Sequence, residues 1–438
     1  MEPSKALDAI HNLIDDEREY VIGLTRDMVR VPSVNPKFET GDGLNREGDV
    51  QSLLAAHLEP LGASLDRWDV FPGRPNLVAT FAGSAERSLL LNGHIDVVPV
   101  GDRSKWTVDP FGGEIADGRI WGRGAVDMKC GVAASLAAVR AILKAGYRPR
   151  GRIDFHSVVD EEAGGFGSID AAKRCAHAVA GIVTEPTWGK VMASEGGLEW
   201  LRVTIPGKNA HSAWRYNSIY PQKNVPGRLE PGVNAADFAG RFLEQLRELE
   251  RDWATTKSHP LAPPGVNTLH VGAVLVGASA DRDGRPTNFS NLAITPDCAA
   301  IEIDLKFLPN ETKEQVRAEF EAFVYSWAQQ YAWLREHPPQ VRWDLYGLHF
   351  PPLNTPVDHP LVKSLIDGRK RLGKETEIAD FIAVCDAAHY AGVGIPCVIY
   401  GCAGDGFHRH DEYVEIESLV ETTKLLAGTI VDWCGLTE

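Results

Sequence analysis

Five residues with metal-binding side chains stand at the ends of apolar, strand-like segments that lie far apart in the chain. They are His94, Asp127, Glu162, Glu185 and His408. In an open α/β sheet, the carboxyl ends of the strands meet at one crevice, where ligands bind. Two imidazoles and three carboxylates supply the nitrogen and oxygen ligands that zinc-like divalent ions prefer. The pattern therefore predicts a metal-dependent hydrolase in which two ions share one water.

Each of these residues also has a common structural role. Asp127 stands just before a long predicted helix and could simply cap it. Glu185 precedes Pro186 and could belong to a turn, and His410 is an alternative ligand to His408. We therefore base the metal prediction on the whole set rather than on any one member.

Two neighbouring acidic residues strengthen the metal prediction. Asp96 lies two residues after His94, so on an extended strand both side chains point to the same face. Its carboxylate can then hold the imidazole from behind, an arrangement that metal sites commonly use. Glu161 is adjacent to Glu162, so the two side chains point in different directions. One of them can bind the metal while the other moves protons.

The composition is that of an ordinary globular enzyme. The chain has 438 residues, 44% of them hydrophobic and 24% charged, which favours two domains, each with its own core. A formal net charge of -15 argues against nucleic acid or an anionic membrane surface as a partner. We find no signal-peptide pattern and no apolar run of the roughly 20 residues that a membrane span needs. Seven cysteines without a C-x-x-C pair indicate reduced thiols, and we expect a cytoplasmic protein.

The order of the predicted elements indicates an α/β fold. Up to residue 193, strand-like segments alternate with helix-like ones, which predicts a mostly parallel sheet covered by helices on both faces. From residue 194 the order changes to strand, helix, strand, strand, which predicts an inserted α+β domain over residues 194–309. The strand before His408 then belongs to the first fold again. We therefore expect a catalytic domain made of residues 1–193 and 310–438.

Several segments match the motifs of a known family. They are GHIDVVPVGDRSKWTVDPFGGEIADGRIWGRGAVDMKCG, DEEAGGFGS, TEP, GKNAHS and GFHRHDEYV. In this order, and over nearly the whole chain, they resemble the acetylornithine deacetylase and succinyl-diaminopimelate desuccinylase family, which also contains aminoacylases, carboxypeptidase G and di- and tripeptidases. The resemblance implies that the inserted domain serves as a lid and for dimerisation, and that the enzyme is a homodimer. It also implies two divalent metal ions, which we expect to be zinc, with cobalt or manganese as alternatives.

The resemblance assigns a metal-binding role to each of the five candidates. Asp127 would bridge the two ions. His94 and Glu185 would complete one site, and Glu162 and His408 would complete the other. His408 is preferred to its neighbour because it stands three residues before the Asp-Glu-Tyr triplet, as in the family.

Further roles follow from the same resemblance. Glu161 would be the general base, and Asp96 would support His94. His211, in the segment GKNAHS, would come from the other subunit of the dimer and bind the scissile carbonyl oxygen. The peptide bond that follows Asp127 would be cis.

The chain departs from the family pattern where the substrate would bind. Lys306 stands where the family usually carries Arg, so a positive charge remains but the bidentate fork is lost. Ala293 replaces an expected Asn, and Asn291 lies nearby but out of step. We retain His211, Lys306 and Asn291 as candidate substrate-binding residues. An extra loop over residues 214–231 could read an unusual acyl or amine group. Its candidate contact residues are Trp214, Arg215, Tyr216, Tyr220 and Lys223.

These observations predict a metal-dependent amidohydrolase. We expect it to cleave the amide bond of an N-acyl amino acid or a related small molecule. The alternatives are a di- or tripeptidase or carboxypeptidase of the same fold, and a non-catalytic metal-binding protein. Glu161 beside Glu162 argues against the last alternative, because a mere binder has no use for a free base. The motifs of serine hydrolases, H-E-x-x-H metalloproteases, P-loop proteins and dinucleotide-binding proteins are absent from the sequence.

Overall fold

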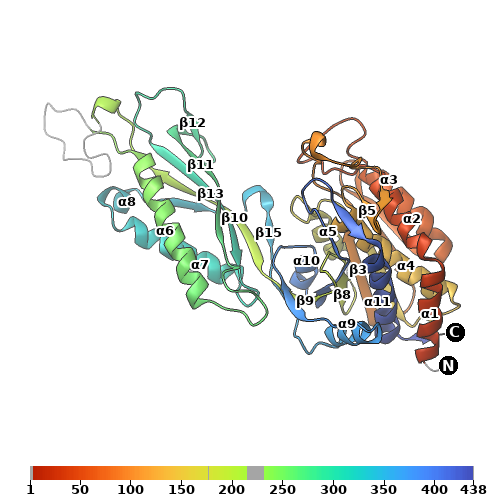
Figure 1. Cartoon of the computed structure of the whole chain (residues 1–438). Helices are drawn as coiled ribbons and strands as arrows, with labels where there is room; N and C mark the ends of the chain where they lie inside the picture. Colours follow the sequence, from red (N-terminus) through yellow and green to blue (C-terminus); the bar gives the residue numbers. More distant parts are fainter. Residues whose placement is uncertain (1–2, 176, 215–230, 438) are drawn as a thin grey trace. The chain divides into compact units, whose positions relative to one another are not determined.

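The computed structural model describes residues 3–175, 177–214 and 231–437 and divides the chain into two compact units (Figure 1). Unit 1 consists of Met1–Glu195 and Leu353–Glu438, and unit 2 is Gly196–Pro352. The insertion that the sequence predicts from residue 194 thus starts at Gly196. No helix within the described ranges is both long enough and apolar enough to cross a membrane.

The end of the insertion differs from the prediction. The sequence suggests that the catalytic domain resumes at residue 310, whereas the chain returns to unit 1 only at Leu353. Helix α7 (Lys313–Ala328) buries Val316, Phe320 and Trp327 in the core of unit 2. Strand β14 (Gln340–Arg342) then pairs with a strand of the same unit. Residues 310–352 therefore complete the inserted unit before the chain leaves it.

Unit 1 is built on a nine-stranded sheet. Its strands, in spatial order, are β1 (Ser64–Phe71), β2 (Arg74–Phe81), β7 (Gly151–Val158), β3 (Ser84–His94), β8 (Gly181–Val183), β18 (Cys397–Ile399), β9 (Val191–Glu195) and β16 (Leu353–Asn354), with β17 (Ile378–Phe381) also paired to β9.

The sheet is mixed rather than mostly parallel. The four central strands β7, β3, β8 and β18 are parallel, as the alternation of strands and helices predicts. The outer strands β1, β2 and β16 pair in antiparallel fashion. Strands β1 and β2 form a hairpin in which Phe71 pairs with Arg74, and Gly73 adopts the positive φ of 76° that such a tight turn requires. The parallel region is the part that positions the candidate ligands.

Helices cover both faces of this central region, as predicted. Consecutive strand residues point to opposite faces. The side chain of Asn92 on β3 donates to Ser168 and Tyr390, which belong to α5 (Phe166–Cys175) and α10 (Ala387–Gly392). The next residue, Gly93, faces Val132 of α4 (Cys130–Lys144), and a Cβ there would lie only 2.7 Å from it. The C-terminal helix α11 (Ile416–Cys434) packs against α4.

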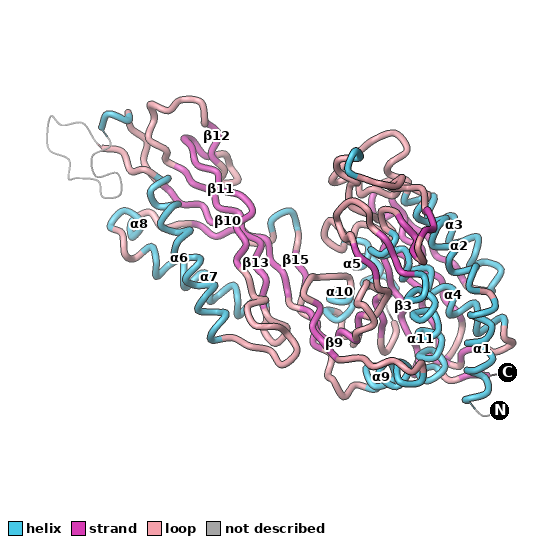
Figure 2. The backbone as a smooth tube through the Cα atoms, viewed as in Figure 1, coloured by secondary structure: helices cyan, strands magenta, loops and turns pink. Residues whose placement is uncertain are grey.

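Unit 2 is an α+β unit. Its sheet has the order β12 (Pro286–Asn288), β11 (Leu269–Ala280), β13 (Cys298–Phe307), β10 (Gly197–Pro206) and β14, and β15 (His349–Phe350) also pairs with β10. All of its strand pairs are antiparallel. Helices α6 (Ala235–Thr256) and α7 lie along one face of this sheet (Figure 2). Their apolar side chains, among them Phe238 and Phe320, form the core of the unit.

Candidate metal centre

Three adjacent parallel strands deliver four of the predicted site residues to one edge of the sheet. His94 is the last residue of β3 and is paired with Val158, the last residue of β7. Glu161 and Glu162 follow β7 in the next turn. Glu185 follows β8, which pairs with β3 on its other side. The carboxyl ends of the strands therefore meet as the sequence pattern predicts.

Asp127 reaches the same place from a sharp turn that precedes α4. The turn η3 spans Ala125–Lys129, and the peptide bond between Asp127 and Met128 is cis, as the resemblance implies. Gly124 enters the turn with a φ of 80°. A side chain there would strain the backbone, because a positive φ is unfavourable for most residues.

A buried carboxylate holds this turn from behind. One oxygen of Glu412 accepts hydrogen bonds from the backbone N–H groups of Val126 and Asp127, at 3.0 and 3.1 Å. Its other oxygen accepts one from Gly124 at 3.1 Å and one from the guanidinium of Arg123 at 2.5 Å. Glu412 is 285 residues from Asp127 in the chain, and its sequence position alone does not indicate this contact. Its role becomes visible only once the fold brings the two together.

The two oxygens of Asp127 face two different histidines. Oδ1 lies 3.4 Å from Nε2 of His94, and Oδ2 lies 3.3 Å from Nε2 of His408. On the first side, Glu185 approaches the same His94 nitrogen at 3.4 Å. On the second side, Glu162 lies 3.0 Å from Nε2 of His408. The arrangement is that of a carboxylate able to bridge two cation positions.

His408, rather than His410, is the histidine beside these carboxylates. It lies in the loop between β19 (Gly404–Asp405) and β20 (Tyr413–Glu415) and has a φ of 55°. Its side chain is 56% exposed, in contrast to the fully buried His94. Hydrogen bonds to Asp127 and Glu162 raise the pKa of His408 to about 10. The cluster is therefore open to solvent at His408 and closed at His94.

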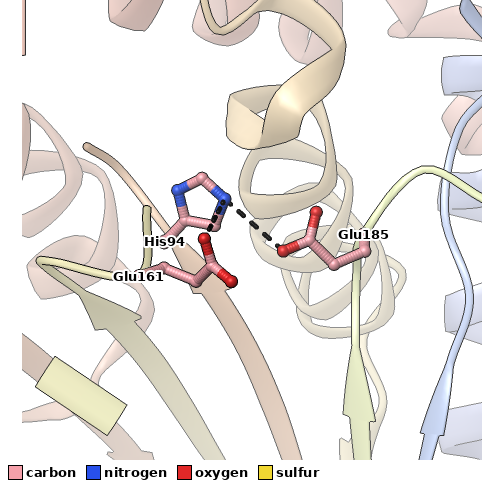
Figure 3. A group of neighbouring side chains, drawn as sticks. All are labelled: His94, Glu161 and Glu185. Atoms are coloured by element: carbon pink, nitrogen blue, oxygen red, sulfur yellow. Dashed lines mark ion pairs between the residues drawn. The ribbon is translucent and has the colours of Figure 1, made fainter. Parts of the chain in front are cut away.

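The hydrogen bonds of His94 fit a metal ligand. Nδ1 lies 2.9 Å from the backbone carbonyl of Asp96, which can only accept, so Nδ1 carries the proton in the neutral imidazole. Nε2 is then a lone pair, completely buried, with no hydrogen bond to any described residue. It points at carboxylate oxygens, which are acceptors as well (Figure 3). A cation between them satisfies all of these groups at once.

Asp96 supports the site differently from the prediction. Its backbone carbonyl holds His94, whereas its carboxylate stands 3.6 Å from Nδ1. That carboxylate instead accepts the backbone N–H of Glu161 at 3.1 Å and the side-chain amide of Asn35 at 2.8 Å. Asp96 thus fixes the position of Glu161.

The carboxylates of the cluster carry the electrostatic signature of a cation site. Burial raises the pKa of Glu185 to about 7 and raises the pKa of Glu161 and of Glu162 as well. Burial alone would lower the pKa of His94, but the carboxylates of Glu185 and Asp127 outweigh it and raise the pKa well above its ordinary value. So many buried acidic groups are stable together only with protons or metal ions among them.

Two overlapping groups of side chains have the ligand spacing of a metal site. They are His94, Glu161 and Glu185, and His94, Asp127 and Glu162; within each group the ligand atoms all lie within 4.8 Å of one another. Figure 3 shows the first group, with Glu161 and Glu185 directed toward the imidazole of His94. Glu161 lies 3.8 Å from Nε2 of His94, farther than Glu185 at 3.4 Å.

The three candidate substrate-binding residues all lie in unit 2. His211 is exposed, and its Nδ1 accepts the backbone N–H of Ala213 at 3.1 Å. Asn291 is also exposed, and its side chain accepts the N–H of Ala293 at 3.1 Å, which fixes a local turn. Lys306 is buried on β13. The structure thus brings the metal-binding candidates together in unit 1 and keeps the substrate-binding candidates in the other unit.

Only the first candidate residue of the extra loop is described. Trp214 is 42% exposed, and its ring centroid lies 5.3 Å from that of His211. Arg215, Tyr216, Tyr220 and Lys223 lie outside the described residues.

Comparisons with known proteins identify the family and the fold. A model of the peptidase family M20/M25/M40 matches residues 90–432. N-formyl-4-amino-5-aminomethyl-2-methylpyrimidine deformylase from Bacillus subtilis is 32% identical over 440 residues, which cover 98% of this chain and 97% of that protein. Succinyl-diaminopimelate desuccinylase from Cereibacter sphaeroides is 39% identical over 428 residues, covering 91% and 94%. Among solved structures, aminopeptidase PepT from Bacillus cereus has a TM-score of 0.70 at 19% identity and covers 95% of this chain and 98% of that one, which shows a shared fold.

Proposed function

The chain belongs to the peptidase family M20/M25/M40 and is an amide-cleaving hydrolase, and we propose that it removes a small acyl group from the nitrogen of a small-molecule amine. The observation that carries the proposal is the pair of histidines on the two oxygens of Asp127, with Glu161 beside them. Two deformylases, from Bacillus subtilis and Halalkalibacterium halodurans, are 32% and 31% identical over 98% and 97% of this chain. Their names favour formyl as the acyl group and an aminomethylpyrimidine as the amine. The sequence-based expectation is an N-acyl amino acid or a related small molecule, and these names favour the second of the two.

We propose that the site holds two divalent ions, with zinc as the first choice and cobalt or manganese as alternatives. His94, Glu185 and one oxygen of Asp127 would hold the first ion. His408, Glu162 and the other oxygen of Asp127 would hold the second. When bound, such ions lower the pKa of a water and polarise the carbonyl that it attacks.

The remaining chemistry belongs to Glu161. Its backbone is anchored by Asp96, and its carboxylate is directed into the cluster without being the closest oxygen to His94. Burial raises its pKa, so it accepts a proton more readily than an ordinary carboxylate. We propose that Glu161 takes a proton from the attacking water and delivers it to the departing amine nitrogen. Proton transfer of this kind is typically worth about 10²–10⁴-fold in rate.

We also propose that the active enzyme is a cytoplasmic homodimer in which His211 of one chain completes the site of the other. Residues Leu269–Gly277 of β11 pair with β13 on one side, and within the described residues no strand pairs with them on the other. An open strand edge of this kind is a ready template for pairing with a second chain. All seven cysteines are free thiols, which suits a reducing compartment.

A substrate panel tests the proposed function. Protein loaded with zinc, cobalt or manganese would be assayed with N-formyl-4-amino-5-aminomethyl-2-methylpyrimidine, N-succinyl-diaminopimelate, N-acetylated amino acids, and unblocked di- and tripeptides. We expect the highest kcat/KM for the formyl compound and loss of turnover after chelation. A clear preference for unblocked peptides would make the protein a peptidase instead. No turnover of any amide by metal-loaded protein would contradict the hydrolase assignment.

A further inference from the structure

An aromatic pair, Trp188 and Phe407, lies next to the segments of the proposed ligands and has no part in the proton transfer described above; Trp188 is exposed and Phe407 is half-buried. Trp188 is 54% exposed, although tryptophan side chains are usually highly buried. Its ring contacts that of Phe407, with centroids 5.1 Å apart and planes at 58°. The backbone of Trp188 has a φ of 53°, a left-handed conformation that is unusual for a bulky residue. The fold thus presents a large apolar ring to solvent in spite of a conformational cost.

The ring of Trp188 is held in place by hydrogen bonds. Its Nε1–H donates to the carbonyl of Gly404 at 3.0 Å, and its backbone N–H donates to the carbonyl of Cys402 at 3.4 Å. These two bonds and the contact with Phe407 restrict the orientation of the indole. A ring that is ordered before a ligand arrives loses little further entropy when the ligand stacks on it.

The two aromatic residues belong to the same two chain segments as two of the proposed ligands, and these segments lie far apart in the sequence. Trp188 follows Glu185 by three residues, and Phe407 immediately precedes His408. Consecutive Cα atoms are 3.8 Å apart, so the Cα atoms of Trp188 and Glu185 are separated by at most about 11 Å. The aromatic pair therefore lies within three residues of two proposed ligands, on both of the segments that carry them.

We propose that Trp188 and Phe407 form a stacking subsite for a planar heteroaromatic ring on the amine half of the substrate. This inference rests on the proposed function and specifies its substrate class as an N-acylaminomethyl heteroarene. Every nucleobase-like ring has a π-face that stacks on an aromatic side chain. In such a compound one methylene joins the ring to the amide nitrogen, so the ring and the scissile bond lie close together, as the aromatic pair and the proposed ligands do along the chain. The amine named in the two deformylase relatives is an aminomethylpyrimidine, whereas diaminopimelate has no ring to stack.

Steady-state kinetics with two substrates test the subsite. N-formyl-4-amino-5-aminomethyl-2-methylpyrimidine would be compared with N-formylbutylamine, which has the amide but no ring. In Trp188→Leu we expect KM for the pyrimidine to rise roughly ten- to a hundredfold, as for the loss of one base–aromatic stack, with kcat changed little. N-formylbutylamine should be hydrolysed as in the wild type. Trp188→Phe should restore most of the affinity, and Phe407→Leu should show a smaller loss.

The controls separate this inference from the proposed function. Tyr325→Leu removes a ring that is 63% exposed on α7 of unit 2 and should leave both substrates unaffected. Equal losses for both substrates in Trp188→Leu would overturn the stacking subsite while leaving the hydrolase intact. If the wild type turns over neither substrate, the proposed function fails. Calorimetry with 4-amino-5-aminomethyl-2-methylpyrimidine then tests the subsite. Binding by the wild type that is weakened in Trp188→Leu supports it. No binding by the wild type, or equal binding by both proteins, overturns it.

Discussion

Glu161 and its neighbour Glu162 differ in their contacts. Glu162 is paired with His408, whereas Glu161 is anchored through its backbone and keeps its carboxylate near the cluster. We expect Glu161→Gln to lower kcat by about 10²–10⁴-fold, because the amide cannot accept a proton. KM and metal content should change little, as measured by kinetics and by elemental analysis of the purified protein. Loss of metal with near-normal turnover per bound ion would show that Glu161 is a ligand instead.

A second expectation concerns Glu185 and pH. Burial raises its pKa to about 7, above its ordinary value near 4.5, so the metal-free fold gains stability from the bound proton, and this gain is lost as pH rises through 7. A metal ion must displace that proton. The rise in Tm on adding zinc to chelator-treated protein should therefore be larger at about pH 8 than at about pH 6. Equal shifts in Tm at the two pH values would contradict a direct role of Glu185 in binding.

The gathering of the candidate ligands at one edge of the sheet could be predicted from sequence, because their types and positions after strands recur in a specific motif. The supporting groups could not. Whether Asp96 holds His94 by its carboxylate or its carbonyl depends on the backbone conformation after β3, which the spacing of two residues does not specify. Glu412 contacts the turn of Asp127 across 285 residues, a pairing that only the folded chain makes visible.

Helix α4 lies unusually close to the strand end that carries Glu185. A Cβ on Gly131 would lie 2.1 Å from the backbone carbonyl of Thr184, a contact that only movement of the helix or the strand end can relieve. We expect Gly131→Ala to destabilise the protein by about 1–3 kcal/mol and to weaken metal binding, because α4 follows Asp127 directly. Denaturation and metal titration would measure both effects.

Gly23 of α2 (Arg18–Val29) provides the matched control. Nothing lies within 4 Å of a Cβ placed there, and the residue is helical. Gly23→Ala should therefore stabilise the protein by about 0.5–1 kcal/mol and leave metal binding unchanged. If Gly131→Ala behaved in the same way, the close packing of α4 would not be what positions the ligands.

At the level of helices and strands, the sequence predicts the α/β class and the parallel centre of the sheet but misplaces one boundary. An amphipathic segment such as α7 must bury its apolar face, yet its pattern does not say which sheet it covers. The antiparallel strand β16 is missed for a related reason. Short strands such as β16, with two residues, carry too few side chains to reveal their partner.

The proposed dimer can be tested by mixing two inactive variants. Glu161→Ala and His211→Ala homodimers should each be nearly inactive, the second because loss of one oxyanion donor typically costs about 10²–10³ in kcat. A mixed dimer contains one site with both residues intact. After subunit exchange, equal mixtures should recover up to about a quarter of wild-type activity, given random pairing in a two-fold dimer. If subunit exchange is confirmed and no activity returns, His211 acts within its own chain or has no role in the reaction.

The interrupted course of unit 1 has a consequence for biosynthesis. Strand β8 pairs with β18, which is more than 200 residues further along, and the loop with His408 follows β18. On the ribosome, Gly196–Pro352 emerges complete before the last strands of the surrounding unit exist. The inserted unit is therefore free to fold first, while one edge of β8 waits unpaired for the C-terminal segment. If His408 is a ligand as proposed, a nascent chain released before residue 408 lacks part of the ligand set, and we expect it to be inactive.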